Sequence, residues 1–230
     1  MPHKSRICAV LVDTSHAMQP HVNDLRGALR RFFRQMQGHE IALLEFGDRP
    51  TVLVNYTTDP RSLEAGVGRV FARSGTGSYV LDAIVDVSRD FRRREGARPI
   101  IVVITAEGPE FSQRAHQVVL DDVRRANATL HSIVLTRPRR GSLFSDAARE
   151  REFTLSKGAR MTGGRREDLL TSMSLADRLQ SLAAELENQY QVVYARPDVL
   201  IPSGRIDVGV NQTRLTVRAP RSPQGLRVLP

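Results

Sequence analysis

Three short, mainly apolar runs stand out along the chain, at residues 7–12, 99–105 and 130–135. The run at 99–105 contains the core Ile-Ile-Val-Val-Ile and is the most apolar stretch of the sequence. A strand that is apolar on both sides must be covered on both faces, as strands inside a parallel sheet are. The pattern therefore predicts three buried parallel strands.

Between these runs, apolar residues recur at steps of three and four, which is the spacing of one helix face. The clearest case extends from Val22 to Met36 and stops near Gly38. The same spacing predicts helices at residues 63–71, 79–94, 113–126 and 175–190. Ser174 and Asp177 have the spacing of a capping box at the start of the last helix. Residues 136–164 carry only weak signals for any element.

Shorter segments predict antiparallel structure. Residues 41–46 and 51–54 flank the turn Gly47-Asp48-Arg49-Pro50, which predicts a hairpin. After Tyr190 the chain changes to alternating, β-branched segments separated by turn residues; they are residues 191–195, 205–210 and 215–218. We expect these to form a small antiparallel β appendage, followed by an extended tail.

The alternation of strands and helices specifies an α/β fold, a Rossmann-like doubly wound structure with a mainly parallel sheet. We expect two units. Residues 1–190 form the α/β domain, and residues 191–230 form the C-terminal β appendage and tail.

Composition removes several classes of protein. The 230 residues are 40% hydrophobic and 26% charged, which suits a globular domain, and no apolar run reaches the roughly 18 residues of a membrane-spanning helix. One cysteine allows no internal disulfide, and 5% aromatics without tryptophan argue against a stacking platform for single-stranded nucleic acid. The start of the chain as written shows no signal segment. We therefore expect a cytoplasmic protein by default, and an exported one if a signal segment is missing from the sequence.

The net charge of +9 is concentrated in two segments. Residues 137–166 carry +6 and residues 196–230 carry +4. Four arginines in the first segment could meet an acidic partner or nucleic acid; they are Arg139, Arg140, Arg165 and Arg166. The alternative is ordinary solvated loop charge, and the excess of arginine over lysine also fits a bias in genomic composition.

Three polar loops follow the predicted strands or precede the predicted helices, at residues 13–18, 74–78 and 105–110. In open α/β sheets, ligands bind beyond the carboxyl ends of the strands. The loops bring carboxylate and hydroxyl oxygens there without thiolates, which suits a hard cation such as magnesium. The candidate ligands are Asp13, Ser15, Ser78 and Glu107.

These loops resemble the metal-ion-dependent adhesion site of the von Willebrand factor A fold. The family's D-x-S-x-S motif reads Asp13-x-Ser15-x-Ala17 here. Alignment on Asp82-Ala83 puts Ser78 at the family's threonine position, with Thr76 as the alternative. Ala106 stands where the third motif has its aspartate, and Glu107 is shifted next to Gly108. Two of the five family positions therefore lack an oxygen ligand.

The resemblance continues beyond the sheet. Thr162-Gly163-Gly164-Arg165 and the pattern Leu186-x-Asn188-Gln189-Tyr190-x-Val192-x-Tyr194 look like bacterial von Willebrand factor A-related proteins of the acidobacterial type. The resemblance implies a protein-binding domain of adhesion or scaffold type. Its partner, an unidentified protein, would bind the loops containing Asp13, His16, Thr76, Ser78 and Glu107. The resemblance implies no firm cofactor, with Mg²⁺ or another divalent cation held weakly or not at all.

Other readings of these residues stay open. Asp13 could be a metal ligand or a cap that accepts hydrogen bonds from the next turn. A nucleic-acid-associated module would use the basic segment 137–166. A hydrolase is the enzyme alternative, although Asp13, Ser15 and His16 are too close in sequence to align as a triad, and the chain has no Gly-x-Ser-x-Gly. The sequence also lacks a P-loop and a G-x-G-x-x-G after the first strand, so we expect a non-enzymatic protein.

Overall fold

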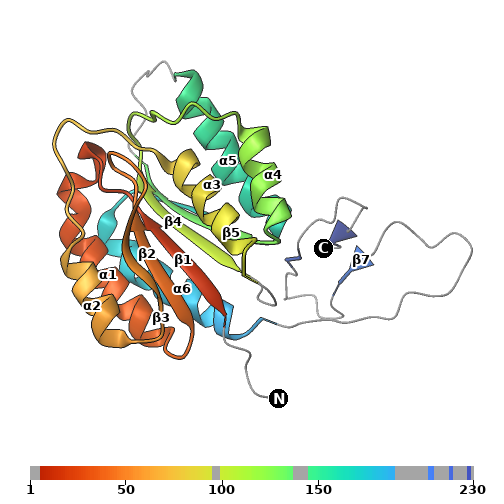
Figure 1. Cartoon of the computed structure of the whole chain (residues 1–230), viewed down its shortest axis with the longest axis horizontal. Helices are drawn as coiled ribbons and strands as arrows, with labels where there is room; N and C mark the ends of the chain where they lie inside the picture. The colour runs from red at the N-terminus through yellow and green to blue at the C-terminus, as the bar shows by residue number, and fades with distance from the viewer. Residues whose placement is uncertain are drawn as a thin grey trace, which may run out of the picture.

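The computed structural model describes residues 6–94, 99–136, 145–189, 207–209, 218–219 and 227–228. Its centre is a six-stranded sheet in the order β3-β2-β1-β4-β5-β6 (Figure 1). The strands are β1 (Ile7–Val12), β2 (Glu40–Glu45), β3 (Thr51–Thr57), β4 (Ile100–Ala106), β5 (Thr129–Leu135) and β6 (Arg166–Leu169). All neighbours pair in parallel except β2 and β3, which form the expected antiparallel hairpin.

The three mainly apolar runs form the middle of this sheet. β1 lies between β2 and β4, and its register with β4 runs from Cys8 opposite Ile100 to Val12 opposite Ile104. Every residue of β4 is buried. The prediction of a mainly parallel sheet with buried central strands is confirmed.

Helices cover both faces of the sheet (Figure 1). α1 (Val22–Gln35), α2 (Pro60–Gly68) and α6 (Leu175–Glu187) pack on one face, where Phe32, Leu63 and Leu182 join one core cluster. α3 (Val80–Phe91), α4 (His116–Arg125) and α5 (Asp146–Thr162) pack on the other, where Ile84, Val123 and Leu155 join a second cluster. The sheet therefore separates two hydrophobic cores, as in a doubly wound fold.

Helix α5 lies in the stretch 136–164, where the sequence carries only weak signals, and β6 follows at residues 166–169, where the sequence predicts no strand. The buried face of α5 is made mostly of small or polar residues, including Thr154, Gly158 and Thr162. A Cβ at Gly158 would lie 2.7 Å from Leu130 Cδ2, so the missing side chain lets α5 pack closely against β5. Close packing through small residues leaves no apolar periodicity in the sequence.

The start of α6 differs from the expected capping box. Ser174 has helical angles (φ −80°, ψ −8°), and its side chain makes no capping hydrogen bond. Thr171, three residues earlier, instead accepts a hydrogen bond from the Met173 N–H and begins a 3₁₀ turn that leads into α6. Because the chain is already helical at Ser174, the serine cannot adopt the extended conformation of a cap.

Two short strands are described beyond residue 190. β7 (Asp207–Val208) and β8 (Arg227–Val228) pair in parallel, and β8 is a short strand in the segment that was predicted to be an extended tail. The partner of β7 comes from the tail rather than from the next segment along the chain, and the two strands run in the same direction. The predicted segment 191–195 and residues 215–217 lie outside the described residues. No helix in the described part of the chain is long and apolar enough to cross a membrane.

Candidate functional site

The candidate site lies where the strand order reverses. β1 has β2 on one side and β4 on the other, and Asp13 directly follows β1 while Thr105 and Ala106 end β4. Crevices at such switch points are the usual ligand sites of open α/β sheets. We call the edge of the sheet formed by loops 13–16, 73–78 and 106–111 the apical face.

Backbone hydrogen bonds tie these three loops to one another. The donor and acceptor pairs are His16 N to Thr76 O (3.2 Å), Arg73 N to Thr14 O (2.9 Å), Ser78 N to Pro109 O (2.8 Å) and Phe111 N to Ser78 O (2.8 Å). The three loops identified in the sequence therefore converge at one edge of the sheet.

Asp13 is fully buried at the centre of this edge. Its Oδ1 accepts a hydrogen bond from the Ser15 N–H at 2.8 Å. Its Oδ2 accepts hydrogen bonds from the Thr105 hydroxyl at 2.7 Å and from the Ala106 N–H at 3.2 Å. Oδ1 therefore caps its own turn, whereas Oδ2 joins this turn to the end of β4.

The two alanines at family ligand positions are structural parts of the same edge. Ala17 is buried, and a Cβ placed on Gly108 would lie 2.7 Å from the Ala17 Cβ. The glycine therefore lets the loop after β4 approach the loop after β1. Ala106 contributes only its backbone, with the N–H donating to Asp13.

An arginine that the sequence analysis missed completes the network. Arg151 extends from α5 and is only 6% exposed. Its Nη2 donates to Thr105 Oγ1 at 3.2 Å and to the Ala106 carbonyl at 2.8 Å, and its Nη1 donates to the Gly108 carbonyl at 3.3 Å. A buried guanidinium therefore lies beside the Asp13 carboxylate, with the Thr105 hydroxyl between them.

A second buried carboxyl lies in the same loop as Glu107. Glu110 is 4% exposed, and its Oε1 accepts a hydrogen bond from the Ser112 N–H at 3.1 Å. Burial raises the pKa of Glu110, while the hydrogen bond from Ser112 and the charge of Arg151 oppose the shift. Among the described residues, neither Glu110 Oε2 nor the Ser78 hydroxyl makes a hydrogen bond of normal geometry.

The other predicted residues of the apical face, His16, Thr76 and Glu107, differ in exposure and in their hydrogen bonds. His16 is exposed, whereas Thr76 uses its hydroxyl within its own loop by donating to the Arg73 carbonyl at 3.0 Å. Glu107 is partly buried, and its N–H donates to the Leu135 carbonyl at 2.8 Å. The buried acidic residue of this loop is therefore Glu110, three positions after Glu107.

The two predicted arginines that the structure describes, Arg165 and Arg166, do not lie on the apical face. Arg166 begins β6, at the opposite end of that strand, and pairs with Glu152 at 2.6 Å and Asp168 at 2.8 Å. Arg165 pairs with Glu167 at 3.0 Å. A hollow of about 330 Å³ lined by Glu152, Arg166 and Asp168 lies between α5 and β6. Arg139 and Arg140 are outside the described residues.

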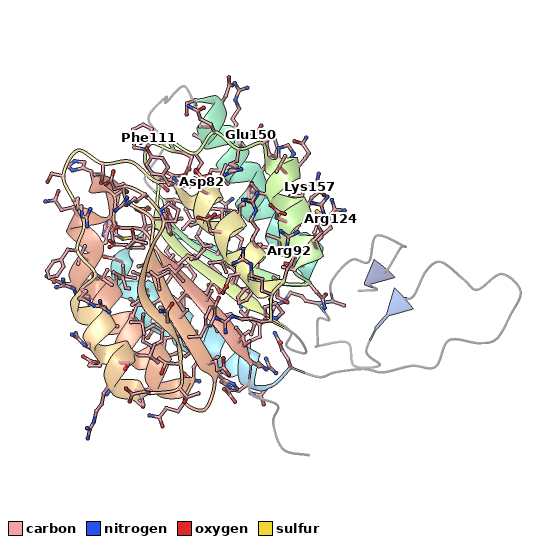
Figure 2. The ribbon with its side chains drawn as sticks, in the orientation of Figure 1. Asp82, Arg92, Phe111, Arg124, Glu150 and Lys157 are labelled. Carbon is pink, nitrogen blue, oxygen red and sulfur yellow. The ribbon has the colours of Figure 1, made fainter. Side chains whose placement is uncertain are left out.

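Exposed apolar side chains also lie at the apical end of the sheet. Phe111 is 49% exposed and packs edge-on against Tyr79, with a centroid distance of 5.9 Å. Figure 2 shows Phe111 in the upper part of the molecule, above Asp82 near the start of α3. Arg92, at the end of that helix, lies far from it. Leu170 and Met173 are 83% and 81% exposed, and Leu170 directly follows the carboxyl end of β6.

Comparison with known proteins supports the resemblance seen in the sequence. Residues 8–108 match the von Willebrand factor type A domain family. Among curated proteins, none matches this chain by sequence.

Solved structures share the fold at low sequence identity. An aerotolerance-related membrane protein from Bacteroides fragilis is 16% identical with a TM-score of 0.60, and the match covers 79% of this chain and 100% of that one. A von Willebrand factor type A protein from Catenulispora acidiphila is 15% identical, with a TM-score of 0.59 and coverage of 79% and 42%. The pilus adhesin SpaC from Lactobacillus rhamnosus GG is 11% identical, with a TM-score of 0.60 and coverage of 81% and 30%. Residues 8–108 are therefore similar to the von Willebrand factor type A family, and the described α/β unit shares its fold with these solved structures.

Proposed function

We propose that the chain is a non-enzymatic protein-binding domain of adhesion or scaffold type, and that its apical face binds the partner. The main support is Phe111, a half-exposed aromatic side chain on loop 106–111 of the apical face, together with the exposed Leu170, which directly follows β6 at the same edge of the sheet. Exposed apolar side chains that gather on one surface of a monomer are typical of protein interaction sites. The same edge is where the fold places ligand crevices.

The local construction of Phe111 supports a role at an interface. A Cβ on Gly77 would lie 2.3 Å from Phe111 Cε2, so the ring lies directly on the glycine backbone. The Phe111 N–H is bonded to Ser78 O, which fixes the residue on its loop. A rigid, half-exposed aromatic side chain is the usual kind of anchor residue in protein interfaces.

The test compares two variants at this edge of the sheet with a variant of an exposed apolar residue on a helix. Phe111→Ser and Leu170→Ser should weaken capture of a partner at least tenfold, measured as the dissociation constant of a partner first identified by pull-down with the wild-type chain. Val118→Ser is the matched control, because Val118 is also 49% exposed but lies on α4. Equal loss in the control, or full binding by both apical variants, would contradict the proposal.

A further inference from the structure

The apical face contains buried charges of both signs at its centre. Asp13 is 0% exposed, Glu110 is 4% exposed and Arg151 is 6% exposed. An isolated buried charge is strongly destabilising unless an opposite charge and hydrogen bonds compensate it. The three groups therefore need one another, although no described carboxylate oxygen lies within ion-pair distance of the Arg151 guanidinium.

One short path of hydrogen bonds connects the guanidinium to Asp13. Arg151 Nη2 donates to the Thr105 hydroxyl, which donates its own proton to Asp13 Oδ2. Hydrogen bonds arranged in series polarise one another, so the positive charge of Arg151 strengthens the hydrogen bond from Thr105 to Asp13. Ala106 also fixes both groups, since its carbonyl accepts from Arg151 and its N–H donates to the same Asp13 oxygen.

The chemistry of these contacts differs from that of a metal site. A divalent cation needs free oxygen lone pairs, and magnesium needs them in near-octahedral geometry. Here Asp13 Oδ2 accepts two hydrogen bonds from protein donors and Oδ1 accepts one, so only one lone pair of Oδ1 remains, and the family positions at Ala17 and Ala106 carry no side-chain oxygen. A guanidinium offers up to five donors to fixed acceptors. Three such acceptors face Arg151, namely the Thr105 hydroxyl and the carbonyls of Ala106 and Gly108.

We propose that the guanidinium of Arg151 is the resident cation of the apical face and takes the electrostatic place of a divalent metal ion. It balances Asp13 and Glu110 from α5 and joins that helix to the loop after β4. The apical face is then complete without metal. This proposal does not depend on the identity of any partner, and its test uses the chain alone.

The first experiment measures energetic coupling between Asp13 and Arg151. The stability of the wild type, Asp13→Asn, Arg151→Met and the double variant is determined by urea unfolding. We expect each single variant to lower the unfolding midpoint and the double variant to lose clearly less than the combined losses, because it leaves neither charge uncompensated. Additive losses would overturn the proposal.

The second experiment measures the response to metal. The melting temperature of the wild type should be the same with EDTA, Mg²⁺ or Mn²⁺, and calorimetry with Mn²⁺ should show no saturable binding in the micromolar range. Micromolar Mn²⁺ binding by the wild type that Asp13→Asn abolishes would overturn the proposal.

Two further variants distinguish the effect of losing the Arg151 charge from a general destabilisation of α5. Arg149→Met is the surface control, because Arg149 lies on the same helix and its side chain is 61% exposed; it should behave as wild type. Arg151→Lys keeps the positive charge but loses the forked geometry of the guanidinium. If Arg151→Met does not fold, Arg151→Lys takes its place in the comparison. We expect Arg151→Lys to fold with a lowered melting temperature and to stay insensitive to metal. Stabilisation of this variant by Mn²⁺ would count against the proposal.

Discussion

His131 is a buried histidine in β5 whose ring nitrogens make no hydrogen bond within the described part of the chain. Burial lowers its pKa to about 3, and the charges of Arg218 and Arg165 act in the same direction. The unfolded chain takes up a proton on this histidine near its ordinary pKa of 6.5, whereas the folded chain does not. Stability is therefore complete above this value and decreases as the pH falls from about 6.5 toward 3.

We expect His131→Leu to remove this pH dependence. The variant should gain stability relative to the wild type, and the gain should be larger at pH 5 than at pH 7.5, because at pH 5 the wild type must release the His131 proton when it folds. Urea unfolding at the two pH values measures the difference. His16→Gln, at an exposed site, is the control. A gain of equal size at both pH values would contradict the assignment.

Only some residues of the candidate site could be predicted from the sequence. Asp13 and Ser15 follow a strongly apolar strand, so their place at the sheet edge could be predicted. Glu110 and Glu107 are both acidic residues of one loop, and only the path of the backbone decides that Glu110 is the buried one. Arg151 could not be found, because its helix shows no apolar repeat and its contact with Thr105 joins distant parts of the chain.

At the scale of secondary structure, β4 is the element whose burial is most complete. Val103 is 0% exposed in that strand, between β1 and β5. We expect Val103→Asp to unfold the α/β unit, since an uncompensated buried charge costs roughly 3–5 kcal/mol or more against a typical total stability of about 5–15 kcal/mol. Circular dichroism and the melting temperature measure the effect.

The matched control for Val103 lies on the edge strand. Val52 of β3 is 51% exposed, so Val52→Asp places the same charge in water and should change stability by about 0.5 kcal/mol or less. A Val103→Asp variant with the melting temperature of the wild type would show that β4 is not the centre of the sheet.

Elements that bury large apolar side chains could be predicted from the sequence, whereas elements that pack through small residues could not. β1, β4 and the helices α1 and α3 bury large apolar side chains, and their periodicity is visible in the sequence. α5 packs through Gly158, Thr154 and Thr162, and the start of α6 depends on Thr171 rather than on the more obvious Ser174. These features depend on the distance between neighbouring elements, which a single sequence does not reveal.

At the scale of the whole molecule, α6 is the last helix of the described α/β unit and covers part of one face of the sheet. Four leucines of this helix, Leu175, Leu179, Leu182 and Leu186, are buried in the core on that face of the sheet. We expect a fragment of residues 1–190 to fold with nearly the melting temperature of the whole chain. A fragment of residues 1–174 should not fold, because the face of the sheet under α6 would be exposed to water. Failure of the longer fragment would contradict the domain boundary at residue 190.

The basic segment also calls for a test on the whole chain. We expect neutralisation of Arg139, Arg140, Arg165 and Arg166 to slow partner association mainly at low salt, as charges at the rim of an interface do. The association rate at two ionic strengths measures this effect. Complete loss of binding in this variant, with binding by Phe111→Ser unchanged, would move the functional surface to the basic segment. A steep loss of affinity with salt would then indicate phosphate contacts with nucleic acid.

The backbone hydrogen bonds between loops 13–16, 73–78 and 106–111 have a consequence for the thermodynamics of recognition. These bonds already hold the loops in one conformation in the folded chain. The loops therefore lose little further conformational entropy when a partner binds. Association should therefore resemble the docking of two rigid bodies, with similar loop conformations in the free and bound states. Its heat capacity change would report the apolar area that is covered, with little contribution from folding of the loops.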